Sequence, residues 1–370
     1  MLLATKIDIH GAGNRERMEP ILEPEVLKST PGRWDNMPWK IFRSLARPQV
    51  YSLKVLDRLY AFLPKSWLRK VCAWVARPKP PHPWPGWRLG SGIAITRIPS
   101  VFRFLLWRAY SSRCSDQDRF LLKWHRGLRL RAFPKDETCG SLFVTGFYEP
   151  NEFYFLNGRL KPGMVFIDVG ANIGLYTIFA SSMVGPQGVV LAVEPSEREF
   201  RLLKANVQLN ACANVRLIPL GLSNRSGERE LLIAEKEHSG HNTFGRFGYA
   251  GVEVAGRQMV KTERLDNLIQ REGLERVDVI KLDVEGHERF VLEGARETLT
   301  RFKPILLVEL IDRPLSLQGC SADQAWNFLI NLGYQILQFD ATTGLPVAAD
   351  KKSSGQENIV AIHPSRLELH

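Results

Sequence analysis

Four ionisable residues lie within the six positions that end at Glu288. The stretch IKLDVEGHERFVLEGA, residues 280–295, places Asp283, Glu285, His287 and Glu288 after an apolar run and at the start of helical spacing. A carboxylate or an imidazole can act as a general base and remove a proton from a hydroxyl group. The same groups could bind a metal ion or stabilise the start of a helix. The elements around them must decide between these possibilities.

Short apolar runs alternate with helical patterns from residue 141 onward. The expected strands cover residues 164–170, 188–195, 215–223, 277–284, 304–310, 334–340 and 358–363. Near-continuous apolar strands alternating with helices predict an α/β fold, doubly wound, with a mostly parallel sheet covered on both faces. Ser196 followed by Glu199 predicts a capping box at the start of the helix over 196–210. Residues 227–261 are expected to form an inserted loop and hairpin.

The turn after the first of these strands has the features of a ligand site. In FIDVGANIG, residues 166–174, Gly170 and Gly174 allow close approach of the backbone, and Asp168 adds a carboxylate. Glu194 ends the next strand, where a carboxylate can accept two hydrogen bonds from a ribose. The turn lacks the full dinucleotide fingerprint, and a carboxylate would repel a pyrophosphate. A ribose, a close backbone contact and a cationic amino-acid tail together indicate S-adenosylmethionine.

Three stretches occur in the order found in FkbM-type methyltransferases, which belong to the class I S-adenosylmethionine-dependent group. These are FIDVGANIGLYTIFAS, AVEPSEREFRLLKANVQLN and the stretch from residue 280 to 295, and the resemblance covers about residues 140–340. It implies a Rossmann-like methyltransferase fold with a seven-stranded sheet whose last strand is antiparallel. It also implies methyl transfer to a hydroxyl of a sugar, glycan, polyketide or related small molecule. The cofactor-binding residues that it implies are Glu149, Asp168, Gly170, Ala171, Asn172, Gly174, Glu194, Leu222, Ser223 and Asp283.

Methyl transfer to a hydroxyl requires both positioning and removal of a proton. Asp283 ends the fourth strand, so we expect it to orient the acceptor or to contact the cofactor. Glu285 and His287 are alternative candidates for the base, and both are expected to reach the same pocket. Glu309 ends the fifth strand at the same edge of the sheet and is a further catalytic candidate. Glu288 is expected to serve the start of the helix.

We expect no metal site. Two acids and one histidine do not form a diagnostic cage, although a magnesium ion, as in catechol-type methyltransferases, is the alternative. The loop over 234–251 contains His238, His241 and several glycines, and it is either a lid over the acceptor or a solvated insertion.

Basic residues are concentrated in the first part of the chain. Of 370 residues with a net charge of +11, residues 1–140 hold 26 Lys and Arg against 11 Asp and Glu. We expect residues 1–139 to form a basic, Trp-rich extension, irregular at first and then helical over 50–76, 98–112 and 116–132, with the catalytic domain over 140–370. Its Trp residues either pack on that domain or, with Arg, allow peripheral contact with an anionic membrane through residues 50–131.

Cysteine usage and hydropathy bear on location. Five scattered cysteines without a CxxC pair indicate a reducing compartment, and no apolar run suggests a signal peptide or a membrane span. The expected location is therefore cytoplasmic. RNA methylation is an alternative function, but the charge lies outside the catalytic part and no nucleic-acid motif supports it. A cofactor-binding scaffold without turnover is the non-enzymatic alternative. No sequence pattern indicates an oligomeric state.

Overall fold

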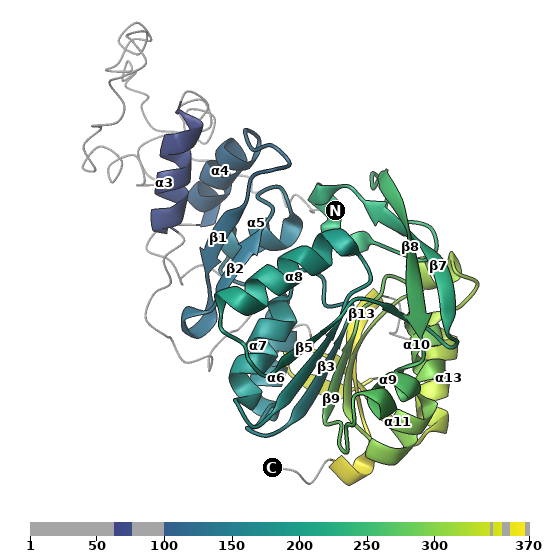
Figure 1. Ribbon diagram of the computed structural model, residues 1–370. Helices are drawn as coiled ribbons and strands as arrows, with labels where there is room; N and C mark the ends of the chain where they lie inside the picture. The colour runs from purple at the N-terminus through teal and green to yellow at the C-terminus, as the bar shows by residue number, and fades with distance from the viewer. Residues whose placement is uncertain (1–62, 76–99, 341–342, 350–355, 367–370) are drawn as a thin grey trace, which may run out of the picture. The chain divides into compact units, whose positions relative to one another are not determined.

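The computed structural model describes residues 63–75, 100–340, 343–349 and 356–366 (Figure 1). All of them belong to one compact unit, Ala46–His370, and the other unit, Met1–Leu45, lies outside the described residues. Within the described residues, no helix is long and apolar enough to cross a membrane.

A mostly parallel sheet of eight strands forms the centre of this unit. Its order is β12-β11-β13-β10-β9-β3-β4-β5. The strands are β3 (Val165–Val169), β4 (Val189–Val193), β5 (Val215–Ile218), β9 (Val279–Leu282), β10 (Ile305–Ile311), β11 (Gln335–Phe339), β12 (Pro346–Ala348) and β13 (Gln356–Ile362). From β5 to β10 neighbouring strands run parallel, while β13 is antiparallel to both β10 and β11. The predicted doubly wound α/β architecture is confirmed.

The expected count of seven strands is one too low. The additional strand is β12, a three-residue edge strand antiparallel to β11. It begins with Pro346, and proline is tolerated at a sheet edge because no neighbour needs its missing N–H. So short a strand leaves no periodic signal in the sequence.

Helices cover both faces of the sheet (Figure 1). One face carries α6 (Pro150–Arg159), α7 (Leu175–Val184) and α8 (Glu197–Leu209), and the other carries α9 (Leu265–Arg271), α10 (Glu288–Gly294), α11 (Arg296–Phe302) and α13 (Ala322–Asn331). Alternate strand residues, such as Ile167 and Ile280, belong to the large apolar cluster that includes α9 to α13. Because side chains alternate along a strand, Asp168 and Lys281 point to the opposite face, toward α7. This double covering explains the near-continuous apolar strands.

Two details of these helices differ from expectation. The pattern over 288–302 forms two helices, α10 and α11, which meet at Ala295. At the start of α8, the Ser196 side chain caps no backbone N–H and its hydroxyl instead donates to the carboxylate of Glu199. The capping box predicted there is therefore wrong, because the two capping side chains bond to each other.

A smaller three-stranded sheet lies beside the main one. It consists of β6 (Gly221–Leu222), β8 (Val254–Glu263) and β7 (Gly227–Ala234), and β7 and β8 form the expected hairpin. Their long connection includes the 3-10 segment η4 (Lys236–His241). The remaining short elements are α12 (Asp312–Ser316), η3 (His125–Gly127) and η6 (Pro364–Arg366).

The described part of the N-terminal extension is helical only in part. It contains α3 (Lys65–Val75), α4 (Ser100–Ser111), β1 (Phe120–Lys123), β2 (Arg129–Ala132) and α5 (Glu137–Val144). The helix expected over 98–112 is confirmed as α4, and the one over 50–76 is described only from residue 63. The helix expected over 116–132 is wrong, because β1 and β2 form an antiparallel hairpin there. Its side chains alternate between buried and exposed, and Arg126 (φ 50°) and Gly127 (φ 86°) make the turn.

Two tryptophans of this region pack inside the protein. Trp107 is 6% exposed and stacks on Phe143 of α5 with ring centroids 4.6 Å apart. Trp124 is 7% exposed and meets Phe153 of α6 edge-on at 4.9 Å. Phe153 in turn stacks on Tyr176 of α7 at 4.3 Å. These two indoles are core residues and are not available to a membrane.

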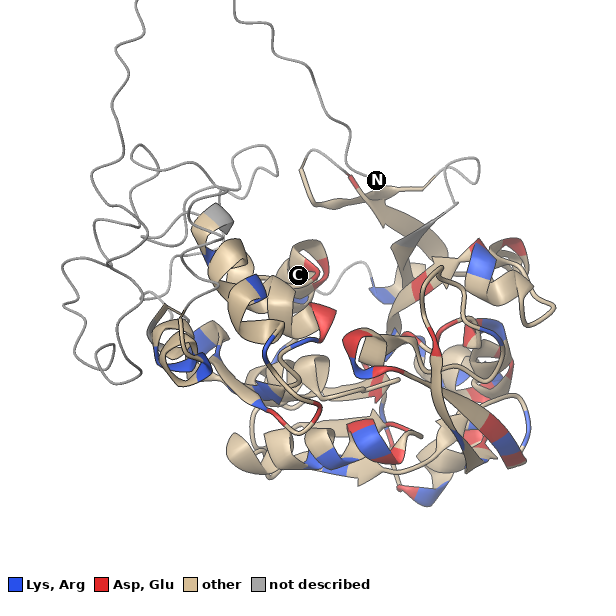
Figure 2. Ribbon diagram, turned by 90° about the horizontal axis from the view of Figure 1, so that it is seen from above, with Lys and Arg blue, Asp and Glu red and all other residues tan. Residues whose placement is uncertain are grey.

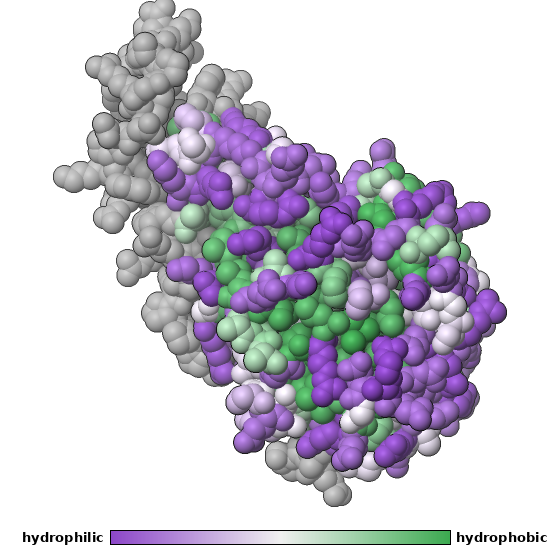
Figure 3. Space-filling view, in the orientation of Figure 1, coloured by the Kyte–Doolittle hydropathy of each residue, from purple (hydrophilic) through white to green (hydrophobic). Residues whose placement is uncertain are grey.

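The edge strand β5 is incompletely covered. Val215 and Leu217 are partly buried against the core, and Figure 3 shows hydrophobic side chains at the surface where Figure 1 draws this end of the sheet.

Gly294 tests the close packing of α10 against β6. A Cβ at this position would lie 2.1 Å from the carbonyl oxygen of Ser223, so the backbone would have to shift. We expect Gly294→Ala to lower the free energy of unfolding by at least about 2 kcal/mol. Gly158→Ala in α6 is the control, because a Cβ there meets nothing within 4 Å and alanine favours a helix. Urea denaturation of both variants measures the difference, and equal stabilities would contradict the packing argument.

Candidate active site

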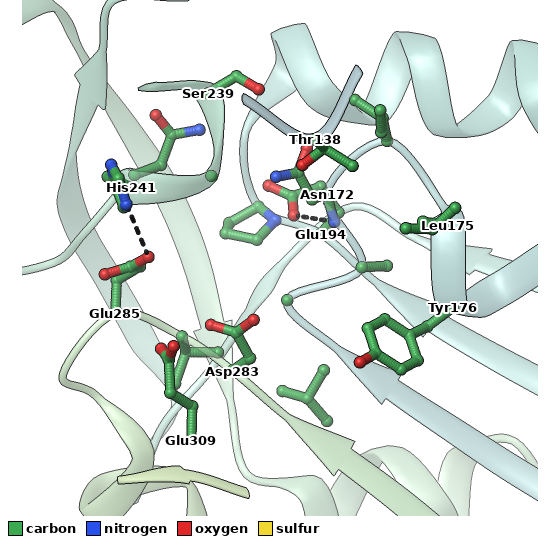
Figure 4. A pocket seen from close by; sticks show the side chains of 18 of the residues that line it. Thr138, Asn172, Leu175, Tyr176, Glu194, Ser239, His241, Asp283, Glu285 and Glu309 are labelled. Carbon is green, nitrogen blue, oxygen red and sulfur yellow. Dashed lines mark hydrogen bonds and ion pairs between the residues drawn. The ribbon is translucent and has the colours of Figure 1, made fainter. Parts of the chain in front are cut away.

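A pocket lies where the parallel strands β3, β4, β9 and β10 end, which is where ligands bind in open α/β sheets. Figure 4 shows its side chains converging from both sides of the sheet edge and from the loop that contains η4. Eight of the residues expected at a site line it: Gly170, Ala171, Asn172, Glu194, Leu222, Asp283, Glu285 and Glu309. Five do not: Glu149, Asp168, Gly174, Ser223 and His287.

The turn after β3 brings backbone from two strands into contact. Gly170 has a φ of +79°, and a Cβ there would lie 1.8 Å from the carbonyl oxygen of Asp283. Gly174 has a φ of +91°, and its Cβ would lie 2.6 Å from a side-chain carbon of Leu203 in α8. Only glycine satisfies both demands at these positions. Gly170 thus sets the spacing between the glycine turn and the end of β9, while Gly174 packs the turn on a helix.

Glu194 and Asn172 form the polar end of the pocket. One carboxylate oxygen of Glu194 accepts from the Asn172 backbone N–H and the other from the Ser196 N–H, each at 2.8 Å. Burial nevertheless raises the pKa of Glu194 to about 8, with the neighbouring Glu199 adding to the effect. Each oxygen keeps a lone pair for a further donor such as a diol. The side-chain oxygen of Asn172 is buried and has no hydrogen-bond partner among the described residues.

Lys281 is a buried cation in the lining of the pocket. Its ammonium donates to Asp283 at 2.6 Å and lies 4.7 Å from the ring centre of Tyr176. Burial lowers the pKa of Lys281, but the charges of Asp283, Glu149 and Asp168 outweigh it and hold that pKa above its ordinary value. Lys281 therefore neutralises part of a group of buried carboxylates.

Asp168 lies beneath the pocket rather than in it. It is the cross-strand neighbour of Lys281 in the sheet, is 1% exposed and accepts a hydrogen bond from Thr177 at 2.6 Å. Its other oxygen is buried without a hydrogen-bond partner among the described residues. Burial raises the pKa of Asp168 to about 6. In this geometry the Asp168 side chain bonds to α7 and does not line the pocket.

Three carboxylates meet at the other end of the pocket. Asp283, Glu285 and Glu309 each contribute an oxygen, and these oxygens lie within 4.8 Å of one another. Burial raises the pKa of both Glu285 and Glu309 well above the ordinary value, and Asp283 and other nearby carboxylates raise it further. Like charges at this spacing favour retention of a proton. An acidic cluster alone does not identify a cation site.

The backbone of Glu285 is held in an unusual conformation. Its φ is 52°, which is costly for a residue with a Cβ. The Glu285 carbonyl accepts from the Thr243 hydroxyl at 2.8 Å and from Gln318 at 3.0 Å. The buried carboxylate of Glu288 accepts from the N–H groups of Val284 and Gly286. These bonds fix the turn and direct the Glu285 side chain toward the pocket, so Glu288 has the structural role expected of it.

His241 faces Glu285 across the pocket (Figure 4). Its Nε2 lies 3.9 Å from a carboxylate oxygen of Glu285, and its ring lies 4.4 Å from that of Tyr249. Burial lowers the pKa of His241 and so favours the neutral imidazole. The loop expected over 234–251 therefore reaches the pocket rather than being a solvated insertion.

His287 does not reach the pocket, so the expectation that it shares the pocket with Glu285 is wrong. It is fully buried, with Nδ1 2.8 Å from Gln318 and Nε2 3.0 Å from the hydroxyl of Ser223. Burial lowers its pKa to about 4. Helical geometry explains the error, because a residue at the N-terminal boundary of α10 turns away from the strand end that carries Asp283. Its partner Ser223 lies outside the pocket with it, whereas Leu222 lines the wall.

Glu149 lies behind the wall as well. It has a φ of 45° at the start of α6, accepts from the hydroxyl of Tyr176, and faces Asn358 at 3.4 Å. Its neighbour Tyr148 lines the pocket instead.

Sequence patterns gave no role to several residues of the site. Lys281 was detectable, because it precedes Asp283 by two positions on one strand and must share its face. Tyr148, Tyr176 and the α5 residues Glu137 and Thr138 carried no such signal, since folding alone brings them to the pocket.

The lining suits a ligand of mixed chemistry. Glu194 offers acceptors for a diol, Leu220 and Leu222 offer an apolar wall, and Asp283 offers a carboxylate to a cation. These three properties fit the S-adenosylmethionine expected from the sequence.

Comparison with known proteins agrees with this architecture. Residues 168–336 match the profile of the Methyltransferase FkbM domain. This match covers slightly less than half of the chain, and over these residues the chain is similar to FkbM methyltransferase domains.

Relatives of the matched region come from diverse organisms. The 31-O-demethyl-FK506 methyltransferase FkbM of Streptomyces tacrolimicus is 30% identical over 38% of this chain and 62% of the relative. The hexuronic acid methyltransferase AglP of Haloferax volcanii is 32% identical over 36% of this chain and 50% of the relative. The match thus spans less than two thirds of either relative. The crystal structure of the methyltransferase FkbM from Methylobacillus flagellatus aligns with 71% of this chain and 59% of its own, at 14% identity and a TM-score of 0.36.

Removal of the Lys281 charge tests the buried carboxylates. We expect Lys281→Met to lower the free energy of unfolding by about 3–5 kcal/mol at pH 8. Without the cation, the pKa values of Asp168 and Glu149 in the folded state rise further above those in the unfolded chain. Stability is then kept while the carboxyls are protonated and lost as pH rises, so the defect should be smaller at pH 5. Urea midpoints at both pH values measure this. Lys261→Met, at an exposed position of β8, is the control, and a defect independent of pH would contradict the assignment.

Proposed function

We propose that the protein is an S-adenosylmethionine-dependent O-methyltransferase. The observation that carries this proposal is the joining of two half-sites in one pocket, a diol-accepting end at Glu194 and an acidic end at Asp283 and Glu285. S-adenosylmethionine is the cofactor, and when bound it supplies an electrophilic methyl group. On the same proposal, residues 140–370 form the catalytic domain and residues 1–139 an extension to it.

The residues that would hold the cofactor follow from their chemistry. Glu194 accepts hydrogen bonds from the ribose hydroxyls, and the backbone around Gly170 and Ala171 allows close approach. The unpartnered side-chain oxygen of Asn172 is an acceptor for a donor on the ligand. Leu222 provides an apolar surface for the adenine ring of the cofactor. Asp168, Gly174 and Glu149 contribute indirectly, because they shape the turn and the wall from behind.

Glu285 is our candidate for the general base. Its raised pKa makes its carboxylate a stronger base than an ordinary glutamate, and its side chain faces the pocket. Asp283, held by Lys281, is fixed in position to orient the acceptor hydroxyl. Glu309 shares the proton of the cluster with Glu285 and thereby adjusts its basicity.

The acceptor is a hydroxyl of a sugar, a glycan or a polyketide-like small molecule. The names of the two relatives support this range, since one acts on an oxygen of demethyl-FK506 and the other on a hexuronic acid. Carboxylates together with aromatic side chains, here Tyr249 and Tyr148, suit polyhydroxylated ligands because they combine hydrogen-bond acceptors with flat apolar surfaces.

Labelled-methyl transfer tests the function and the base together. Protein, labelled S-adenosylmethionine and a cell extract are incubated, and the label is followed into glycan, lipid, RNA and protein fractions. We expect label in the glycan or small-molecule fraction, and a loss of about 10²–10⁴-fold in rate for Glu285→Gln with cofactor binding retained. The wild-type rate should rise with pH because the base acts in its deprotonated form. The rate of Glu285→Gln should not show this rise.

The exposed Glu253→Gln is the matched control. Label confined to RNA would favour RNA methylation, and no transfer despite cofactor binding would favour a scaffold. Activity abolished by a chelator and restored by magnesium would replace the base assignment with a metal-assisted reaction.

We further propose that residues 50–131 contact an anionic membrane surface peripherally. On the hairpin, Leu121 is paired with Arg131 and Lys123 with Arg129, and all four side chains are exposed. On α4, Phe104 is 51% exposed. Figure 2 draws the Lys and Arg residues of the described elements in blue. We expect the protein to sediment with vesicles containing anionic lipid, and less so after Lys123→Glu with Arg131→Glu. Neutral vesicles are the control, and equal binding to both vesicle types would contradict an electrostatic contact.

A further inference from the structure

The loop segment η4 is tied to residues that precede the matched FkbM region. The hydroxyl of Ser239 donates to a carboxylate oxygen of Asp136 at 2.5 Å, and both residues are buried. Two ion pairs surround this bond, Lys135 with Glu237 at 3.2 Å and Asp116 with Lys236 at 3.3 Å, and a carboxylate oxygen of Glu137 lies 3.4 Å from Nδ1 of His238. The ion pairs are partly exposed and individually weak. The buried bond between Ser239 and Asp136 is therefore the principal tie.

Asp136 is itself firmly held. It is the N-cap of α5 and accepts from the backbone N–H of Cys139 at 3.2 Å with the oxygen that does not bind Ser239. One carboxylate thus joins the start of a helix to the loop. Because α5 packs through Phe143 against Trp107 of α4, the tie connects the loop to the aromatic core of the N-terminal region.

The tied loop covers the end of the pocket that contains Glu194. A Cβ on Gly240 would lie 3.7 Å from the side-chain nitrogen of Asn172, so the loop backbone passes directly over the glycine turn. Thr138 of α5 lines the same end, and Figure 4 shows it beside Asn172 and Glu194. The far end of the loop is also fixed, because Asn242 donates to Glu199 of α8 at 2.9 Å. Any ligand at Glu194 is enclosed by these two segments.

We propose that Asp136 is a positioning residue that, through Ser239, holds loop Lys236–His241 closed over the nucleoside half of the cofactor site. This inference rests on the proposed binding of S-adenosylmethionine. Asp136 makes no contact with the reacting atoms in this role. The segment from Asp116 to Thr138, outside the matched family region, thereby completes the site, and loss of the tie lets the loop open and the cofactor dissociate faster.

Two variants of the full-length protein separate the tie from the helix cap. Ser239→Ala removes the tie and leaves Asp136 as the cap of α5. Asp136→Asn keeps both functions, because asparagine caps helices well and can bond to the Ser239 hydroxyl. The dissociation constant of S-adenosylmethionine is measured by calorimetry, and backbone hydrogen exchange of residues 235–243 is measured in the absence of the cofactor.

For Ser239→Ala we expect about tenfold weaker cofactor binding and faster exchange in the loop. Turnover at saturating cofactor should stay unchanged, so the effect falls on the KM for the cofactor and not on kcat. Asp136→Asn should behave like the wild type. Ser321→Ala, which removes the N-cap of α13 away from the pocket, should cost stability without changing cofactor affinity.

The outcomes distinguish the two proposals. A wild-type protein that binds no S-adenosylmethionine overturns the proposed function and this inference with it. A wild type that binds while Ser239→Ala binds equally well, with unchanged loop exchange, overturns only the tie. A variant defect in kcat alone would show that the loop acts on the chemistry and not on the enclosure of the cofactor, which also contradicts the proposal.

Discussion

The site depends on one buried ammonium group among carboxylates. Lys281 reaches Asp283 directly and lowers the cost of the charges on Asp168 and Glu149, which all lie in the interior near the end of the sheet. Buried charges of like sign are tolerated only where an opposite charge compensates them. Because strands β3 and β9 are in register at Asp168 and Lys281, the compensation is set by sheet pairing rather than by a flexible loop. The acidic character of the pocket is thus a property of the sheet itself.

The two ends of the pocket are positioned by different means. The end at Glu194 is built from backbone: two N–H groups bind the carboxylate, and Gly170 brings the turn against the carbonyl of Asp283. The end at Glu285 is built from a backbone turn that is unfavourable by itself and is kept in place by Glu288, Thr243 and Gln318. Both ends of the pocket are therefore held in place, and the distance between the Glu194 end and the Glu285 end is fixed. A reaction between two bound molecules requires such fixed positions.

Most of the fold could be predicted from the sequence, because apolar strands and amphipathic helices alternate from residue 141 onward. The residues at strand ends, such as Glu194, Asp283 and Glu309, were predictable for the same reason. The failures have local causes. His287 stands two positions after Glu285, yet the turn into α10 sends it to the opposite side. The hairpin over 120–132 is rich in Leu and Arg, which favour helices. The segment nevertheless forms two strands, because alternate side chains are buried against the core. The contribution of Asp136 and Thr138 depends on tertiary contacts that no periodicity encodes.

The aromatic contacts beneath the pocket have a practical consequence. Trp124 meets Phe153 at 4.9 Å, Phe153 stacks on Tyr176 at 4.3 Å, and Tyr176 forms part of the pocket wall. A buried indole is therefore connected to the ligand site through two successive ring contacts. Its fluorescence emission depends on the packing and polarity of its immediate surroundings, so a shift of the Tyr176 ring would reach this indole through Phe153.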